Sequence, residues 1–181
     1  MIDLLIQGAT VLDGTGAPAF IASVGVSEGR ITHIGNPVRA RRTVDASGLT
    51  LAPGFIDVHT HDDISLIATP EMQTKIKQGV TTVITGLCGY SAAPFPPDCV
   101  PPQEYAILLR DATDCFETFA GYLAAVGAAA PAVHYLPLVG HSTLRIAAMD
   151  RLDRPATEAE IESMGALMDE ALDAGAAGLS T

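Results

Sequence analysis

The stretch of sequence that decides the fold is Leu51-Ala52-Pro53-Gly54-Phe55-Ile56-Asp57-Val58-His59-Thr60-His61, where a Pro-Gly turn signal leads into an apolar run that ends on two histidines. We expect a β-strand from Phe55 to His61, because the run is short, apolar and preceded by a turn. Side chains alternate between the two faces of a strand, so Asp57, His59 and His61 would share one face. Both imidazoles then point to one place, where they are suited to hold a metal ion such as zinc, with Asp57 as an outer partner.

A pair of histidines two positions apart is a weak motif on its own, so the surrounding sequence must support a metal role. The pair ends an apolar strand and is followed by Asp62 and Asp63, which we expect to be solvated acids at the polar rim of the fold. In parallel barrels the active site is built at the carboxyl ends of the strands. The context therefore favours His59 and His61 as metal ligands over ordinary buried or exposed histidines.

The sequence after Gly54 alternates strand-like and helix-like segments, as the βα units of a parallel sheet or barrel do. The expected strands are runs of mostly apolar residues at positions 55–61, 80–85, 133–139 and 176–181. The expected helices cover positions of about 70–77, a region that includes 115–126, and the segment that Thr157 and Glu160 begin as a capping box and that ends before Gly175.

The first 53 residues have a different texture from the rest. Short β-branched runs alternate there with turn signals such as Gly14-Thr15-Gly16 and Glu28-Gly29. We therefore expect an α/β protein, in which residues 1–53 form part of a small N-terminal β-sandwich and residues 54–181 form the first four βα units of a (β/α)8 barrel. A whole barrel takes about 250 residues, so we expect this chain to hold only its first half.

The composition argues against nucleic-acid and membrane partners. The chain has 21 acidic and 10 basic residues, and its formal net charge of -11 repels phosphate backbones and anionic lipid surfaces. The first residues, Met1-Ile2-Asp3, lack the basic leader of a secretory signal, and no apolar stretch is long enough to span a bilayer. The cysteines, Cys88, Cys99 and Cys115, are too sparse for a disulfide framework, so we expect a cytoplasmic protein.

Several stretches resemble a known group of enzymes. Residues 51–61 resemble the strand-one signature of the amidohydrolase superfamily, and residues 8–16 and 29–31 resemble its N-terminal β-domain. Three further stretches, at 78–89, 138–145 and 174–181, are similar to the N-acyl-D-amino-acid deacylase (D-aminoacylase) family. The resemblance runs nearly from end to end and is weakest in the proline-rich loop.

The resemblance implies a zinc hydrolase that acts on a small-molecule substrate, an N-acyl-D-amino acid, and releases a carboxylate and a free D-amino acid. In that family a cysteine at the end of strand two is a metal ligand where many relatives use a carboxylated lysine, and Cys88 falls at this position. A thiolate beside two histidines also suits zinc chemically, although a plain buried cysteine is the alternative. The resemblance places the remaining histidine ligands and an aspartate base beyond Thr181.

One further residue has a possible role in the site, and two cysteines are expected to be structural. His141 ends the third expected strand. There it could contact the substrate or a residue that supports the metal ligands from outside, and the alternative is that it has no role in the site. Cys99 and Cys115 are expected to be structural, because free cysteines are commonly buried.

Two other functions are compatible with these residues. One is a cyclic amidase of the hydantoinase or dihydroorotase kind, which a lysine bridging two metals at a strand end would support, but Lys75 and Lys77 lie in an expected helix. The other is a non-catalytic fragment, because ancestry and activity are separate claims. A half-barrel exposes strand edges and an apolar face, so we expect the 181-residue chain to self-associate.

Overall fold

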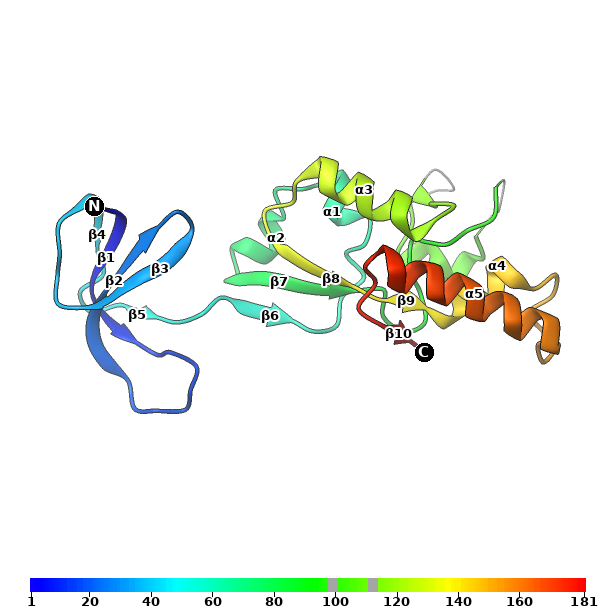
Figure 1. The fold of residues 1–181 in the computed structure, drawn as a ribbon, viewed down its shortest axis with the longest axis horizontal. Helices are drawn as coiled ribbons and strands as arrows, with labels where there is room; N and C mark the ends of the chain where they lie inside the picture. The colour runs from blue at the N-terminus through cyan, green and yellow to red at the C-terminus, as the bar shows by residue number, and fades with distance from the viewer. Residues whose placement is uncertain (98–100, 111–113) are drawn as a thin grey trace. The chain divides into compact units, whose positions relative to one another are not determined.

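The computed structural model describes residues 1–97, 101–110 and 114–181, which divide into two compact units, Met1–Pro53 and Gly54–Thr181. The first unit consists of strands and turns, and the second alternates strands with helices, so the chain is an α/β protein as expected (Figure 1). Cys99 lies outside the described residues, and its structural role stays a prediction. Among the residues described, no helix is both long enough and apolar enough to cross a lipid bilayer.

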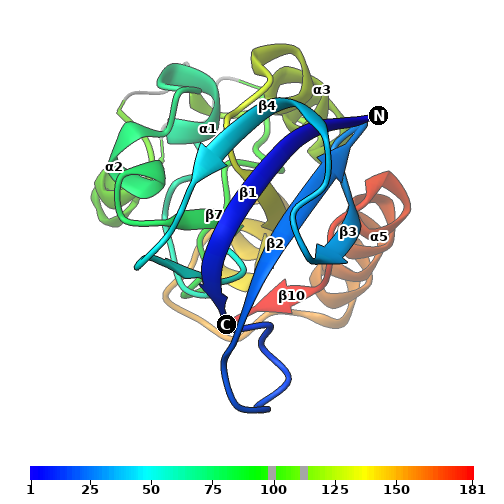
Figure 2. The same ribbon diagram turned by 90° about the vertical axis from the view of Figure 1, so that its left-hand side faces the viewer.

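The first unit is a five-stranded sheet, whose longer strands Figure 2 shows. β2 (Phe20–Ser27) pairs antiparallel with β1 (Ile2–Val11) and β3 (Arg30–Gly35), whereas β4 (Ala40–Asp45) and β5 (Thr50–Leu51) pair parallel with β1. The small core consists of apolar side chains from β1, from β2 and from the residue after β4: Ala9, Val11, Ala22, Val24 and Ala46. The unit forms one β-layer, and its place in a β-sandwich stays a prediction.

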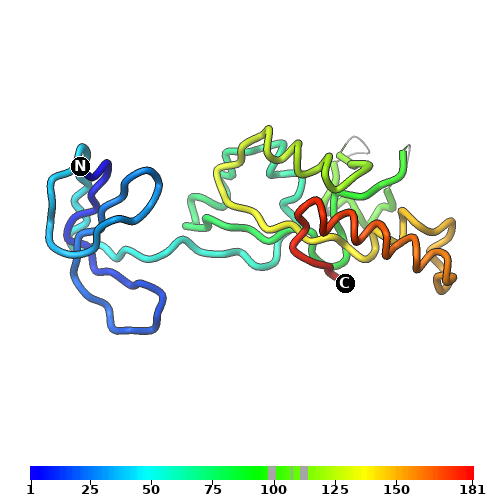
Figure 3. Tube along the Cα trace, in the orientation of Figure 1, coloured from blue at the N-terminus to red at the C-terminus, as the bar shows by residue number. Residues whose placement is uncertain are grey.

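The second unit is built on parallel strands whose order in space follows their order in the chain. β6 (Phe55–Asp57), β7 (Val80–Thr85) and β8 (His134–Pro137) form one parallel sheet, and β9 (Val139–Gly140) pairs parallel with β10 (Leu179–Ser180). A single residue separates β8 from β9, and helical segments separate the other neighbours, a path that the trace in Figure 3 follows. This is the arrangement of consecutive βα units.

The longer helices of this unit begin at residues that cap them. α3 (Phe119–Ala129) starts after Thr118, whose hydroxyl accepts a hydrogen bond from the Gly121 amide at 3.0 Å. α5 (Glu158–Ala174) starts with the expected capping box, whereas α4 (His141–Ala148) follows β9 directly. A capping side chain satisfies amides that the helix itself leaves free, so α3 begins at its cap and later than the apolar pattern suggested.

The helix expected at about 70–77 is shorter than predicted. The four-residue helix α2 (Gln73–Ile76) lies in this region, another four-residue helix, α1 (Ser65–Ala68), precedes it, and Pro70 lies between the two. Proline has no amide hydrogen and disfavours a helical backbone in the residue before it. Met72, with a left-handed φ of 45°, then sets the start of α2.

A buried core joins the helices to the parallel strands. α1 and α3 lie side by side on one side of these strands, as Figure 1 shows. Large, fully buried apolar side chains of this core come from the helices and strands alike, among them Leu66, Val83, Phe119, Tyr122, Val126 and Val139. The core holds the carboxyl ends of the strands in fixed positions, which matters for the site described next.

Strand β6 is shorter than expected, and both histidines lie beyond its end. The strand ends at Asp57, whose side chain accepts a hydrogen bond from the His59 amide at 3.4 Å. An aspartate that bonds to the backbone two residues later favours a turn over a continued strand. The strict alternation of a strand therefore does not place His59 and His61, and the loop after β6 does.

Candidate metal centre

The loop that carries the two histidines is tied to the neighbouring strand β7. The amide and the hydroxyl of Thr60 both donate to the Ile84 carbonyl oxygen, at 3.1 and 2.9 Å. Thr60 is buried, and the rings of His59 and His61 on either side of it lie edge to face with centroids 5.8 Å apart. The threonine between the histidines thus anchors the loop near the carboxyl end of β7.

Cys88 lies in a tight turn just after β7. Its φ is 55°, and Gly86 and Gly89 have φ of 76° and 77°. A residue with a side chain keeps a left-handed backbone only where its surroundings impose it. Ser180 of β10 imposes it here, because its hydroxyl donates to the Gly86 carbonyl and accepts from the Gly89 amide at 3.1 Å. The Gly86 amide also donates to the Asp63 carboxylate at 3.2 Å.

Three potential ligands meet where the histidine loop and this turn come together. Nε2 of His59 lies 3.0 Å from Sγ of Cys88, and the ligand atoms of His59, His61 and Cys88 all lie within 4.8 Å of one another. Nδ1 of His61 is buried and has no hydrogen-bond partner among the residues that the structure describes. Two imidazole nitrogens and a thiolate are ligands that zinc prefers, so the residues present fit a zinc ion.

The protonation state of His61 suits a ligand. Burial lowers the pKa of His61, the neighbouring His59 lowers it further, and the Asp62 carboxylate raises it in part. Neutral imidazole binds metal ions, whereas the protonated ring does not. The surroundings of His61 therefore favour its ligating form at neutral pH.

Two of the aspartates around the histidines are bonded to one lysine. Nζ of Lys75 lies 2.8 Å from Oδ2 of Asp57 and 2.8 Å from Oδ2 of Asp62. The hydrogen bond from Lys75 lowers the pKa of Asp57 and outweighs the opposite effect of burial. Burial lowers the pKa of Lys75, but the hydrogen bond to Asp57 and the ion pair with Asp62 outweigh it and leave this pKa raised. Lys75 is therefore a protonated ammonium that is held by two carboxylates.

The expectation that Asp62 and Asp63 are solvated acids at the rim is wrong. Asp63 is only 1% exposed, and burial raises its pKa to about 7, although the hydrogen bond from Gly86 lowers it in part. The Asp62 side chain is 19% exposed and forms an ion pair with Lys75. Both acids lie inward because the turn after β7 and the lysine of α2 supply partners that the local sequence does not reveal.

His141 lies where the sequence predicted, but outside the ligand cluster. It is the first residue of α4, directly after β9, and so it lies at the carboxyl end of the third strand. Among the described residues, the convergent ligand atoms belong to His59, His61 and Cys88 and not to Asp57 or His141. Contact of His141 with a substrate stays a prediction. Cys115 packs against the core.

A cavity of about 310 Å³ lies beside one of the potential ligands. His61 lines it together with Arg110 and with apolar and hydroxyl side chains, among them Ile64, Ser65 and Leu108. A small molecule in this cavity would lie next to the imidazole, so the cavity belongs to the surroundings of the candidate centre.

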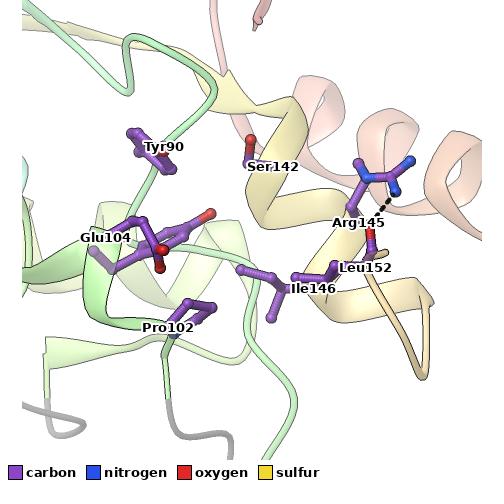
Figure 4. A pocket seen from close by; sticks show the side chains of 8 residues that line it. Tyr90, Pro102, Glu104, Ser142, Arg145, Ile146 and Leu152 are labelled. Carbon is purple, nitrogen blue, oxygen red and sulfur yellow. Dashed lines mark hydrogen bonds between the residues drawn. The ribbon is translucent and has the colours of Figure 1, made fainter. Parts of the chain in front are cut away.

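A second pocket, of about 260 Å³, lies between Tyr90 and α4 (Figure 4). The described residues that line it do not include His59, His61 or Cys88. Its one guanidinium group, that of Arg145, donates to the carbonyl oxygens of Leu152 at 3.2 Å and Arg154 at 3.1 Å. Arg145 therefore holds the loop after α4, and this pocket is separate from the metal-ligand cluster.

Comparison with known proteins identifies the family. Residues 42–181 match the family model described as "Amidohydrolase family". The chain belongs to the amidohydrolase family. This amidohydrolase is 49% identical to the N-acyl-D-aspartate deacylase of Alcaligenes xylosoxydans xylosoxydans over 181 residues, which cover 99% of this chain and 36% of that protein.

Two solved structures are similar to this amidohydrolase. A crystal structure of D-aminoacylase matches it with a TM-score of 0.96 and 48% identity, over 100% of this chain and 38% of the other. The second is the N-acyl-D-glutamate deacylase of Bordetella bronchiseptica, in complex with zinc and a phosphonate mimic of the tetrahedral intermediate. It matches with a TM-score of 0.90 and 43% identity, over 99% of this chain and 38% of the other. These matches confirm the resemblance to the deacylases, and the chain spans 36–38% of the length of these relatives.

Two residues of this amidohydrolase that support the site were missed from the sequence. Lys75 is 18 residues from Asp57, and Ser180 is 91 residues from Gly89, so no local pattern joins them to the histidines or to the cysteine. Ser180 lies in the last of the stretches that resemble the deacylases, which is a signal that could have pointed to it. No comparable signal marks Lys75.

Gly86 allows a test of the turn that carries Cys88. A Cβ at Gly86 would lie 2.0 Å from the Leu138 carbonyl oxygen, and the φ of 76° is itself unfavourable for a side chain. In a full-length form of this amidohydrolase, of the length of its relatives, we expect Gly86→Ala to lower the free energy of unfolding by at least ~2 kcal/mol. Urea denaturation followed by circular dichroism measures the change.

The matched control is Gly127→Ala on α3, where a Cβ would meet nothing within 4 Å. Alanine is the better helix former, so this variant should gain ~0.5–1 kcal/mol. If Gly86→Ala were as harmless as Gly127→Ala, the close approach of Gly86 to Leu138 would be wrong.

Proposed function

We propose that these residues hold part of the zinc centre of an enzyme that hydrolyses the amide bond of N-acyl-D-amino acids to a carboxylate and a free D-amino acid. The observation that carries the proposal is the convergence of His59, His61 and Cys88, whose ligand atoms lie within 4.8 Å of one another. Support comes from the identity of 49% to an N-acyl-D-aspartate deacylase and from the zinc in the N-acyl-D-glutamate deacylase structure.

The residues of this chain would hold and place the reacting groups. Zinc bound by the three ligands supplies polarisation of the amide carbonyl and water of lowered pKa. Thr60 fixes the histidine loop, and Ser180 and Asp63 fix the turn of Cys88, so the ligands are placed before an ion arrives. The cavity of about 310 Å³ beside His61 would receive part of the substrate.

The cyclic amidase with a metal-bridging lysine has less support. Lys75 is an ammonium bonded to Asp57 and Asp62, with its pKa raised, whereas a bridging carbamate needs an uncharged amine. In this chain Cys88 takes the strand-two position where many amidohydrolases carry that lysine, as the resemblance to the deacylases implies. A linear amide is therefore the proposed substrate.

Paired substrates of opposite hand test the proposed activity. We expect the full-length enzyme to hydrolyse N-acetyl-D-aspartate, N-acetyl-D-glutamate or N-acetyl-D-methionine faster than the matching L compounds. Removal of zinc with a chelator should abolish the reaction, and added zinc should restore it. An enzyme that opened hydantoin rings but left all of these linear amides intact would contradict the proposal and favour a cyclic amidase.

We also propose that further strands close these βα units into a (β/α)8 barrel, and that the 181-residue chain alone self-associates. Phe55, Ile56 and Val58 are 64%, 60% and 64% exposed, and among the described residues β6 pairs only with β7. Exposed apolar side chains on an unpaired strand edge favour association with another chain. Sedimentation velocity of this chain should show dimers or larger species, and a monodisperse, cooperatively melting monomer would contradict the proposal.

A cytoplasmic location is proposed from the cysteines. The three cysteines, Cys88, Cys99 and Cys115, are too few for the disulfide framework of a secreted domain, and such a sparse set is typical of proteins in reducing compartments. Fractionation of cells that produce the protein tests this, and recovery outside the cytosolic fraction would contradict it.

A further inference from the structure

Lys75 joins the two ends of the histidine loop. Its ammonium lies 2.8 Å from Asp57, the last residue of β6, and 2.8 Å from Asp62, the residue after His61. His59 and His61 both lie between these aspartates in the chain. A single side chain of α2 thus closes the loop that carries two of the three proposed ligands.

We propose that Lys75 is a positioning residue, which fixes the spacing of His59 and His61 for a metal ion by closing this loop with two ion pairs. The proposal rests on the zinc centre proposed above and names a residue that sets the geometry of that centre. Lys75 itself is not a ligand, because its ammonium is bonded to the two carboxylates.

The other contacts of the loop do not join its two ends. Thr60 fixes the middle of the loop to Ile84, and the His59 amide bonds to Asp57 at 3.4 Å near the start. The Asp62 carbonyl accepts from the Leu66 amide at 3.0 Å, which ties it forward to α1. Among the contacts of the described residues, the link from the Asp57 end to the Asp62 end is therefore Lys75.

The two ion pairs are partly shielded from water. The side chains of Lys75, Asp57 and Asp62 are 19%, 33% and 19% exposed. Fully exposed pairs contribute little because solvent screens them, whereas removal of one partner from a shielded pair leaves an uncompensated charge. Without Lys75, two carboxylates would remain at the loop ends with no cation between them, so the ends would separate and the imidazoles would lose their spacing.

Cobalt(II) binding to the full-length protein tests this role. The thiolate-to-cobalt absorption band reports Cys88, and the ligand-field bands report the geometry around the ion. We expect Lys75→Met to weaken cobalt affinity ~10- to 100-fold, the range for residues that support ligands from outside, and to shift the ligand-field bands. Lys75→Arg keeps a cation that can bond both carboxylates, and it should recover most of the affinity.

The matched control is Lys77→Met. Lys77 is exposed and directly follows α2, so its replacement should leave the affinity and both sets of bands unchanged. Circular dichroism checks the folding of each variant. If Lys75→Met does not fold, Asp62→Asn removes one arm of the bridge and should weaken cobalt binding in the same direction.

Four outcomes decide the proposal. Weaker binding and shifted bands in Lys75→Met, with recovery in Lys75→Arg, support it. Wild-type affinity and bands in a folded Lys75→Met or Asp62→Asn variant overturn it, and so does a loss of affinity with unshifted bands that Lys75→Arg does not recover. Failure of the wild-type protein to show a thiolate-to-cobalt band overturns the proposed zinc centre, and the role of Lys75 with it.

Discussion

The Cys88→Ala form of the full-length enzyme is expected to retain little zinc and to lose its amidase activity. The change removes the sulfur from a cluster whose ligand atoms lie within 4.8 Å of one another, and leaves two imidazoles from this chain. Supporting residues outside the ligand sphere already cost ~10- to 100-fold in metal affinity, so loss of a ligand should exceed that range. Metal content by mass spectrometry and initial rates on N-acetyl-D-amino acids measure both effects.

Cys115→Ala is the matched control for this experiment. Cys115 packs against the core and lies outside the ligand cluster, so its replacement should affect stability and leave zinc content unchanged. If Cys88→Ala kept both the zinc content and the rate of the wild-type enzyme, the assignment of Cys88 as a ligand would be wrong.

The 181-residue chain by itself is expected not to hydrolyse N-acetyl-D-amino acids at a useful rate. Two histidines and one thiolate suffice to hold zinc, but hydrolysis also needs a base for the water proton and a charge for the substrate carboxylate. Asp57 and Asp62 are bonded to Lys75, and Asp63 is buried against the Gly86 amide. None of these acids is placed as a free base.

The expected loss of rate follows from the lack of a placed general base and of a group that orients the substrate. Absence of a general base typically costs ~10²- to 10⁴-fold in rate, and absence of substrate orientation costs more. Intact mass and metal content of the purified chain separate an incomplete enzyme that binds zinc from a fragment that binds none. Turnover of N-acetyl-D-methionine by a mass-verified 181-residue chain, abolished by His59→Ala, would contradict this prediction.

Elements with local signals could be predicted from the sequence. β7 has the predicted bounds, 80–85, because a β-branched run follows a glycine whose φ of 79° ends the preceding helical turn. The capping box of Thr157 and Glu160 starts α5, and Gly175 ends it with a left-handed backbone. Each of these signals lies within a few residues of the feature that it predicts.

Features that depend on distant residues could not be predicted in the same way. Asp63 appeared to be solvated because its bond to Gly86 spans 23 residues, and the role of Ser180 depends on contacts across more than 90 residues. The rings of His59 and His61 do lie close together, but strand alternation is not the reason, because β6 ends at Asp57 and a loop brings the rings together. The place of Cys88 beside them came from the family resemblance.

X-ray absorption at the zinc edge of the full-length protein tests the central claim most directly, because it identifies sulfur among the ligands of the ion. A sulfur neighbour at about 2.3 Å, together with nitrogen or oxygen neighbours, is expected in the wild-type protein. The same sulfur signal should be absent from any zinc that Cys88→Ala retains. A wild-type spectrum that contained only nitrogen and oxygen neighbours would contradict a centre built on His59, His61 and Cys88.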